Sequence, residues 1–256
     1  MNQIRFSDKH PITSSIIATF LFLFVITVSS VISGVTGISS KITLFIAFSV
    51  LALFLVLFTS MTKNWKRYGF NSVGKMDKAS RSLFIPLFVI ALLPLVVGFS
   101  NDLKAQDIIY IILFMAIVAF AEETMFRGVV LRTLQKKSNV YAIWGSCLLF
   151  SIPHLLNALN GINSVDAIVQ TLYALVIGLI LAMLMIQTNN IVLLIIFHFT
   201  NNTVSSITRS DVSASFELYF TSFILVIGVV YAIYLYRTLR KNDLKSEDIS
   251  SNLIDI

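Results

Sequence analysis

The sequence is short of charged residues. Asp, Glu, Lys and Arg make up only 12% of the 256 residues, whereas hydrophobic residues make up 57%. A soluble domain carries roughly a quarter of its residues as charges, so the shortage excludes an ordinary soluble fold. The mean hydropathy of +0.87 is that of a chain built to lie in a lipid bilayer.

Cysteine is almost absent as well. The single Cys147 excludes an intrachain disulfide and any cysteine-rich metal site. It lies in an apolar run beside Leu148 and Leu149, where we expect it to pack in the interior. The fold must therefore depend on burial and helix packing rather than on cross-links.

What the sequence does contain is a series of long apolar runs. A spanning helix needs about 20 apolar residues, and runs of about that length lie at 12–33, 42–61, 82–99, 107–131, 140–157, 166–186, 190–207 and 216–236. The sequence predicts an all-α polytopic membrane bundle of about eight transmembrane helices. Residues 1–241 form one transmembrane domain, and residues 242–256 form a short polar cytoplasmic tail.

The basic residues are unevenly divided between the two sides of this bundle. If the N-terminus is cytoplasmic, most of the 19 Lys and Arg residues lie on that side, and the opposite side holds only Lys41, Lys104 and Arg209. Because short cytoplasmic loops are enriched in Lys and Arg, both termini are predicted to be cytoplasmic, in a multi-pass protein of the cell membrane. The net charge of +6 then reflects orientation, and no nucleic-acid partner is expected.

A few ionisable and amide residues lie inside the predicted spans. They are Glu122, Glu123, Arg127, His154, His198, Asn201 and Asn202. Such groups are costly at membrane depth unless they are paired or hydrated, so they are candidates for function. A lone His or Asn in a membrane helix often only links helices. Two adjacent glutamates and two histidines on three different helices favour a functional site.

The helical spacing separates the roles of the two glutamates. At about 100° per residue, Arg127 lies roughly 40° from Glu123 but roughly 140° from Glu122 around the helix. The spacing predicts an ion pair between Glu123 and Arg127. Glu122 is then free to face other helices and to act as a general base.

Two further pairs of residues are spaced so that each pair lies on one face of a helix. His198 and Asn202 are four residues apart and share a face, as Phe150 and His154 do. At 1.5 Å per residue, Glu122 and His198 both lie roughly 10 Å from the cytoplasmic surface, whereas His154 lies nearer roughly 20 Å. A carboxylate, two imidazoles and an amide supply the base, the water-orienting group and the oxyanion donors that amide hydrolysis requires.

Three motifs in the chain resemble those of a known family. Glu122-Glu123-Thr-Met-Phe-Arg127 resembles the EExxxR signature of the CAAX protease and bacteriocin-processing family (CPBP, or Abi). The family's FxxxH and HxxxN elements resemble Phe150-Ser-Ile-Pro-His154 and His198-Phe-Thr-Asn-Asn202. The motifs follow in the family's order within a core of about residues 107–207.

The resemblance implies an intramembrane endopeptidase of eight helices. It implies that Glu122 activates water with help from His154, and that His198 and Asn202 form the oxyanion hole. Glu123 and Arg127 would support the site. The implied substrate is a membrane-associated peptide or small protein, and the implied role is peptide maturation or bacteriocin immunity.

Other interpretations remain open at this point. No cofactor is expected, yet two histidines and a carboxylate could bind zinc with an open position. Asn202 is a poor zinc ligand and suits an oxyanion donor better. A second functional interpretation is a non-catalytic membrane scaffold that regulates a partner such as a sensor kinase. A proton-coupled transporter is disfavoured, because no pair of Gly- or Pro-broken helices occupies corresponding halves of the chain.

Overall fold

A computed structural model describes residues 6–63, 65–155, 163–209 and 211–254. Over these residues the chain is a bundle of helices without strands, and an isolated β-bridge joins Phe99 to Thr208. The elements are α1 (Phe6–Lys9), α2 (Pro11–Thr36), α3 (Ser40–Met61), η1 (Val73–Lys75), α4 (Lys78–Ser82), α5 (Ile85–Leu92), η2 (Leu93–Val97), α6 (Ala105–Glu123), η3 (Thr124–Val130), α7 (Leu131–Gln135), α8 (Asn139–Ser151), α9 (Ser164–Thr188), α10 (Ile191–Ile207) and α11 (Ala214–Ile254). The predicted all-α class is confirmed.

Six helical segments of the described chain are long and apolar enough to cross a bilayer: Pro11–Thr36, Ser40–Met61, Lys78–Val97, Ala105–Gln135, Ser164–Thr188 and Ser215–Lys241. Their outer faces carry exposed apolar side chains, and Phe20, Phe54 and Val230 are each more than half exposed. Water would not tolerate so large an apolar surface, whereas lipid covers it. The chain is a multi-pass membrane protein.

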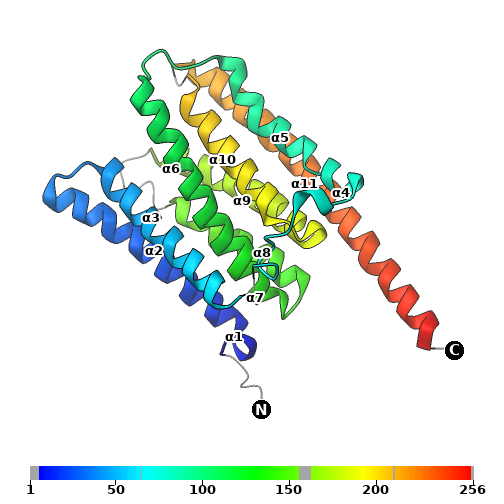
Figure 1. Cartoon of the computed structure of the whole chain (residues 1–256). Coiled ribbons are helices and arrows are strands. Elements are labelled where there is room, and N and C mark those ends of the chain that lie inside the picture. The colour runs from blue at the N-terminus through cyan, green and yellow to red at the C-terminus, as the bar shows by residue number, and fades with distance from the viewer. Residues whose placement is uncertain (1–5, 64, 156–162, 210, 255–256) are drawn as a thin grey trace.

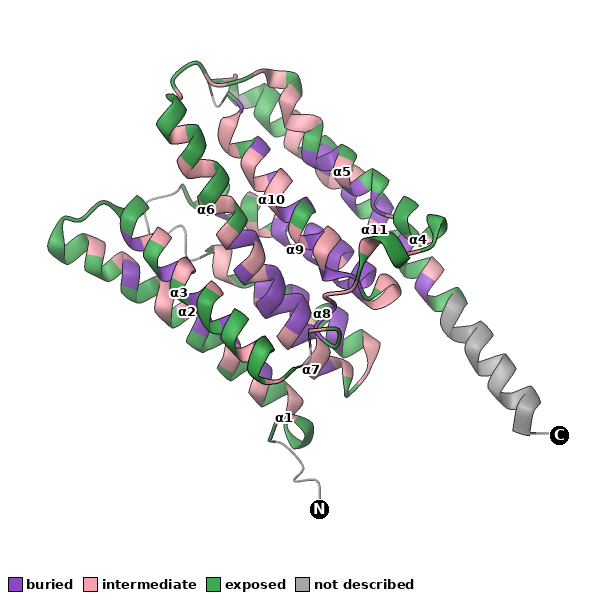
Figure 2. Cartoon of the chain, viewed as in Figure 1, coloured by how far each residue is buried: buried purple, intermediate pink, exposed green. Residues whose placement is uncertain are grey.

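The helices pack around α6, which lies between the α2–α3 hairpin and α10 (Figure 1). On the other side of α10 lies α5, while α9 packs against both α8 and α11. Buried residues gather where α6 and η3 meet α8, α9 and α10, and the α2–α3 hairpin is largely exposed (Figure 2). The interior of the bundle therefore lies around the second half of α6, which carries the predicted polar residues.

Prolines interrupt two of the predicted spans. The prediction of one helix over 140–157 was wrong. Helix α8 ends at Ser151, and a 3₁₀ turn covers 152–155. The rest of the predicted range lies outside the described residues. Pro153 explains the early end, because it has no N–H to donate and disfavours helix at the residue before it. Pro86 and Pro94 lie in the first turns of α5 and η2 and divide the run predicted at 82–99, although Lys78–Val97 as a whole is still long enough to cross a bilayer.

The α10 helix is also short, at 17 residues. Since α8 and α10 are shorter than the six spanning segments, the count of eight transmembrane helices stays a prediction. At the other end of the chain, α11 continues as helix through Ile254, so the backbone of the predicted polar tail is helical up to that residue.

The loop that follows α3 is hydrogen-bonded to the turn between α9 and α10. The Ile191 N–H donates to the Gly69 carbonyl at 2.8 Å. The Asn71 amide donates to the Asn189 carbonyl at 2.7 Å, and the Asn190 amide donates to the Asn71 carbonyl at 3.0 Å. These bonds hold the N-terminus of α10 in place. In Figure 1, α1 and the far end of α11 point toward this same end of the bundle, as termini on one side of the membrane would.

Candidate active site

A short π-helical segment interrupts the helix that carries the first motif. Helix α6 ends at Glu123, and η3 covers Thr124–Val130. The Leu131 N–H bonds to the Phe126 carbonyl, five residues earlier. The buried Ser146 hydroxyl on α8 donates to the same carbonyl at 2.9 Å. Wide turns of this kind are frequent at functional sites. No residue pattern in this segment predicted the turn.

Glu123 and Arg127 form the predicted ion pair. The Arg127 Nη1 lies 2.9 Å from Glu123 Oε1, and both side chains are fully buried. The Arg127 guanidinium also lies over the ring of Phe150, 4.2 Å from its centroid, which adds a cation–π contact. The pair thus joins the end of α6 to the middle of η3, and Phe150 links both to the end of α8. The predicted ion pair is confirmed.

His198 lies between the two glutamates. Its Nδ1 is 2.8 Å from Glu123 Oε1, and its Nε2 is 3.6 Å from Glu122 Oε2. An ionised carboxylate can only accept hydrogen bonds, so Nδ1 donates to Glu123 and the ring presents Nε2 to Glu122. Glu123 therefore orients His198 as well as pairing with Arg127.

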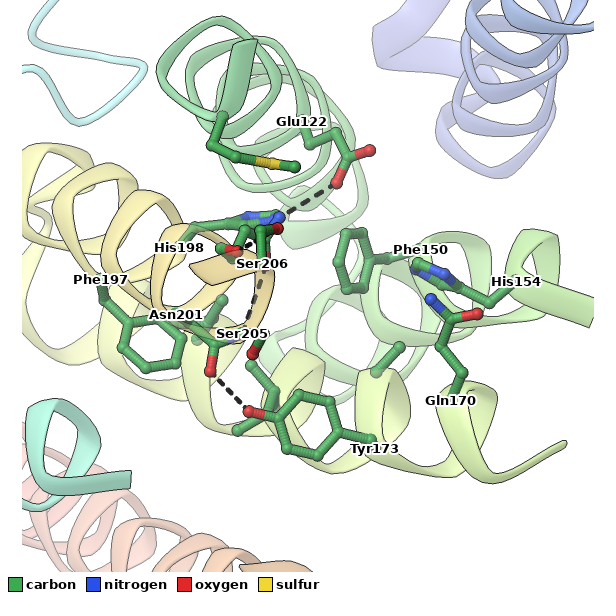
Figure 3. Close-up of a pocket in the computed structure, with 15 residues that line it drawn as sticks. Glu122, Phe150, His154, Gln170, Tyr173, Phe197, His198, Asn201, Ser205 and Ser206 are labelled. Atoms are coloured by element: carbon green, nitrogen blue, oxygen red, sulfur yellow. Dashed lines mark hydrogen bonds and ion pairs between the residues drawn. The ribbon is translucent and has the colours of Figure 1, made fainter. Parts of the chain in front are cut away.

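Glu122 occupies a different environment from its neighbour. Its carboxylate is 17% exposed, against 0% for Glu123, and it points into a cavity (Figure 3). The separation of 3.6 Å from His198 Nε2 is long for a direct hydrogen bond but within the distance of an ion pair. As the helical spacing predicts, Glu122 faces other helices and Glu123 faces Arg127.

The cavity has a volume of about 370 Å³ and lies among α6, α8, α9 and α10. Its lining includes Glu122, His154, His198 and Asn202 together with Met115, Phe150, Gln170, Tyr173, Ala174, Ile177, Leu181, Phe197, Asn201, Ser205 and Ser206. The structure thus brings one or more residues of all three motifs to one space inside the bundle. Glu123 and Arg127 are buried and do not line the cavity.

His154 reaches the cavity from the turn after α8. The ring of Phe150 contacts His154 at a centroid distance of 5.6 Å and His198 at 6.1 Å, so it lies between the two imidazoles. Within the described chain, no hydrogen bond or ion pair joins His154 to Glu122. His154 is therefore set apart from the Glu122–His198 pair, on the opposite wall of the cavity (Figure 3).

Several residues that line the cavity were not predicted from the sequence. On α10, Ser205 and Ser206 follow Asn201 and Asn202 by one turn, and this i, i+4 repetition of polar residues was a signal that could have found them. Tyr173 on α9 gave no comparable signal. Its hydroxyl donates to Asn201 Oδ1 at 2.6 Å, across a pair of helices.

The residues do not form an evident zinc site. Zinc needs three or four nitrogen, sulfur or oxygen ligands around one point. In the part of the chain that the structure describes, no group of three or more His, Cys, Asp or Glu side chains could hold a metal ion. The ring of Phe150 separates the two histidines that the zinc interpretation would need.

Comparison with known proteins identifies the motif-bearing region. Residues 104–204 match the model of a family described as type II CAAX prenyl endopeptidase, Rce1-like. The matched segment contains all three motifs and confirms the resemblance predicted from them. No curated protein and no solved structure matches the chain.

Proposed function

We propose that this chain, whose residues 104–204 match the type II CAAX prenyl endopeptidase model, is an intramembrane endopeptidase that cleaves its substrate with a water molecule activated by Glu122. The observation that carries the proposal is the shared cavity. Glu122, His154, His198 and Asn202 come from distant parts of the sequence and line one space of about 370 Å³. Buried polar groups that converge on a cavity are the usual arrangement of an enzyme site.

The proposed reaction is a general-base hydrolysis. Glu122 takes a proton from water, and the water oxygen forms a bond to the carbonyl carbon of the substrate. His154 orients this water from the opposite wall. The tetrahedral intermediate collapses as the carbon–nitrogen bond breaks, and Glu122 returns the proton to the leaving amine nitrogen.

The negative oxygen of the intermediate needs donors. In the proposal these are His198, through Nε2, and the amide of Asn202, which lies one turn further along α10. His198 can donate from Nε2 while Nδ1 donates to Glu123 only if its ring is cationic. The charges of Glu122, Glu123, Arg127 and His198 then sum to zero, as a low-dielectric interior favours.

The substrate class follows from the size and location of the cavity. A volume of about 370 Å³ is within the range of ligand sites, and it suits a short extended segment rather than a folded domain. We propose a membrane-associated peptide or small protein of the cell membrane as the substrate. Peptide maturation or bacteriocin immunity is the proposed role.

The test is the Glu122→Gln variant, which keeps the size of the side chain and removes the base. Mass spectrometry compares the peptides that wild-type and variant cells release or retain, and blotting of membrane fractions verifies insertion. We expect the cleavage products to disappear. Glu217→Gln is the matched control, because Glu217 also lies on a spanning helix but does not line the cavity.

A normally inserted Glu122→Gln protein that yields the wild-type peptides would contradict the proposed hydrolysis. If it also rescues the phenotype of a deletion strain, the scaffold function is the better account. Loss of cleavage in both glutamate variants would equally count against a specific role for Glu122.

A further inference from the structure

The lining of the cavity contains a chain of hydrogen bonds in addition to the motif residues. The Tyr173 hydroxyl on α9 lies 2.6 Å from Asn201 Oδ1 on α10, and the bond is visible in Figure 3. Asn201 is only 8% exposed. A polar amide buried to this extent inside a membrane bundle must satisfy its hydrogen-bonding groups locally, so this contact fixes how Asn201 is oriented.

Asn201 in turn contacts its neighbour along α10. With Oδ1 engaged by Tyr173, the Asn201 Nδ2 faces the other way and donates to Asn202 Oδ1 at 3.3 Å. Adjacent residues on a helix point about 100° apart and do not normally face each other. The bond between these two amides therefore depends on Asn201 being held by something outside α10, and Tyr173 is that partner.

The consequence concerns the amide of Asn202. An asparagine side chain has one oxygen that accepts and one nitrogen that donates two hydrogens. Because Asn201 engages the oxygen, the donating nitrogen of Asn202 is the group that remains for a ligand in the cavity. That is the orientation that an oxyanion donor requires. The opposite orientation would present an oxygen to the oxyanion and repel it.

We propose that Tyr173 and Asn201 are positioning residues, which hold the Asn202 amide with its NH₂ group toward the reacting carbonyl. The inference rests on the proposed function and adds to it a part of the site that lies on α9. Neither residue need touch the substrate. Each acts through Asn202. The hydrogen bond from Tyr173 on α9 to Asn201 on α10 makes the orientation of the Asn202 amide depend on the position of α9.

The experiment is a double-mutant cycle on purified protein in lipid nanodiscs, with a fluorogenic peptide taken from the cleavage products found for the wild type. Loss of an oxyanion donor lowers kcat by about 10² to 10³ fold, so Asn202→Ala should show a loss of that order. Tyr173→Phe removes only the hydroxyl and should lower kcat by about tenfold with KM unchanged, a partial loss of the same stabilisation. In the Asn202→Ala background, Tyr173→Phe should have no further effect.

Tyr231→Phe is the matched control. Tyr231 is also a buried tyrosine whose hydroxyl donates to another element, at the Leu83 carbonyl, but it does not line the cavity. We expect kcat to stay at the wild-type value in this variant. Thermal unfolding of all variants separates a general loss of stability from a loss of positioning.

Two results would overturn the inference. One is an unchanged kcat in Tyr173→Phe. The other is a tenfold loss that persists in the Asn202→Ala background, since Tyr173 would then act independently of Asn202. Both are distinguishable from failure of the proposed function itself, which would appear as activity in Glu122→Gln.

Discussion

Glu123 and Arg127 meet one helical turn apart at 2.9 Å, with neither side chain exposed. Removal of one partner leaves the other as an uncompensated charge in the interior, at a cost of about 3 to 5 kcal/mol. We therefore expect Arg127→Met to lower the thermal unfolding temperature strongly in detergent micelles, and the double variant Glu123→Gln, Arg127→Met to recover part of the loss.

The Arg209–Asp211 pair is the matched control for that measurement. Its atoms also approach to 2.8 Å, but the side chains are 44% and 72% exposed, and exposed pairs contribute about 0 to 1 kcal/mol. Arg209→Met should leave the unfolding temperature nearly unchanged. Equal effects of Arg127→Met and Arg209→Met would show that burial of the first pair has no energetic consequence.

Gly69→Ala should destabilise the protein. Gly69 has φ +91°, and a β-carbon there would lie 3.2 Å from the β-carbon of Ile191 and against the end of Met185. The left-handed backbone alone costs a residue other than glycine about 1 to 2 kcal/mol. We expect a lower unfolding temperature and, because Ile191 begins α10, lower activity. Gly34→Ala, where nothing lies within 4 Å, should be neutral or stabilising by up to about 1 kcal/mol.

Ser146→Ala tests the support of the π-helical segment. Its hydroxyl donates to the Phe126 carbonyl at 2.9 Å, and loss of one such bond costs about 1 kcal/mol. Since η3 carries Arg127, which pairs with Glu123, and Glu123 orients His198, we expect kcat to fall by more than the small change in stability explains. Ser49→Ala removes a hydroxyl that only contacts its own helix, at the Phe45 carbonyl, and should leave kcat unchanged.

Chelation tests the chemistry of the site. In the described chain no group of three or more His, Cys, Asp or Glu side chains is arranged so that it could hold a metal ion, and the proposed hydrolysis uses Glu122 as the base. Activity in nanodiscs should survive prolonged treatment with phenanthroline. Inactivation by the chelator, reversed by added Zn²⁺, would contradict the proposed mechanism and favour a metal-activated water.

The features that could be predicted from the sequence depend on residues that are close together along the chain. The Glu123–Arg127 pair follows from an i, i+4 spacing on one helix, and the lipid-facing helices follow from runs of apolar residues. The separate directions of Glu122 and Glu123 follow from the 100° between neighbours. These features depend on residues close together in the chain, so their pattern is visible before any fold is known.

Features that depend on contact between distant segments could not be predicted in this way. The π-helical turn is supported by Ser146, 20 residues beyond Phe126. Tyr173 and Asn201 are 28 residues apart, and nothing in either segment indicates the other. His154 depends on both local and distant residues. Pro153 ends the helix earlier than the apolar run predicts, which is a local effect. The position of His154 at the cavity depends on contacts with the distant helices that line it.

The composition of α10 has a consequence for how the protein is made. At 17 residues the helix is about 25 Å long, shorter than the roughly 30 Å hydrocarbon core, and it carries His198, Asn201 and Asn202. Such a segment partitions poorly from the translocon into lipid by itself. We expect it to leave the translocon only when α5 and α6, its packing partners, are already in the bilayer to receive it.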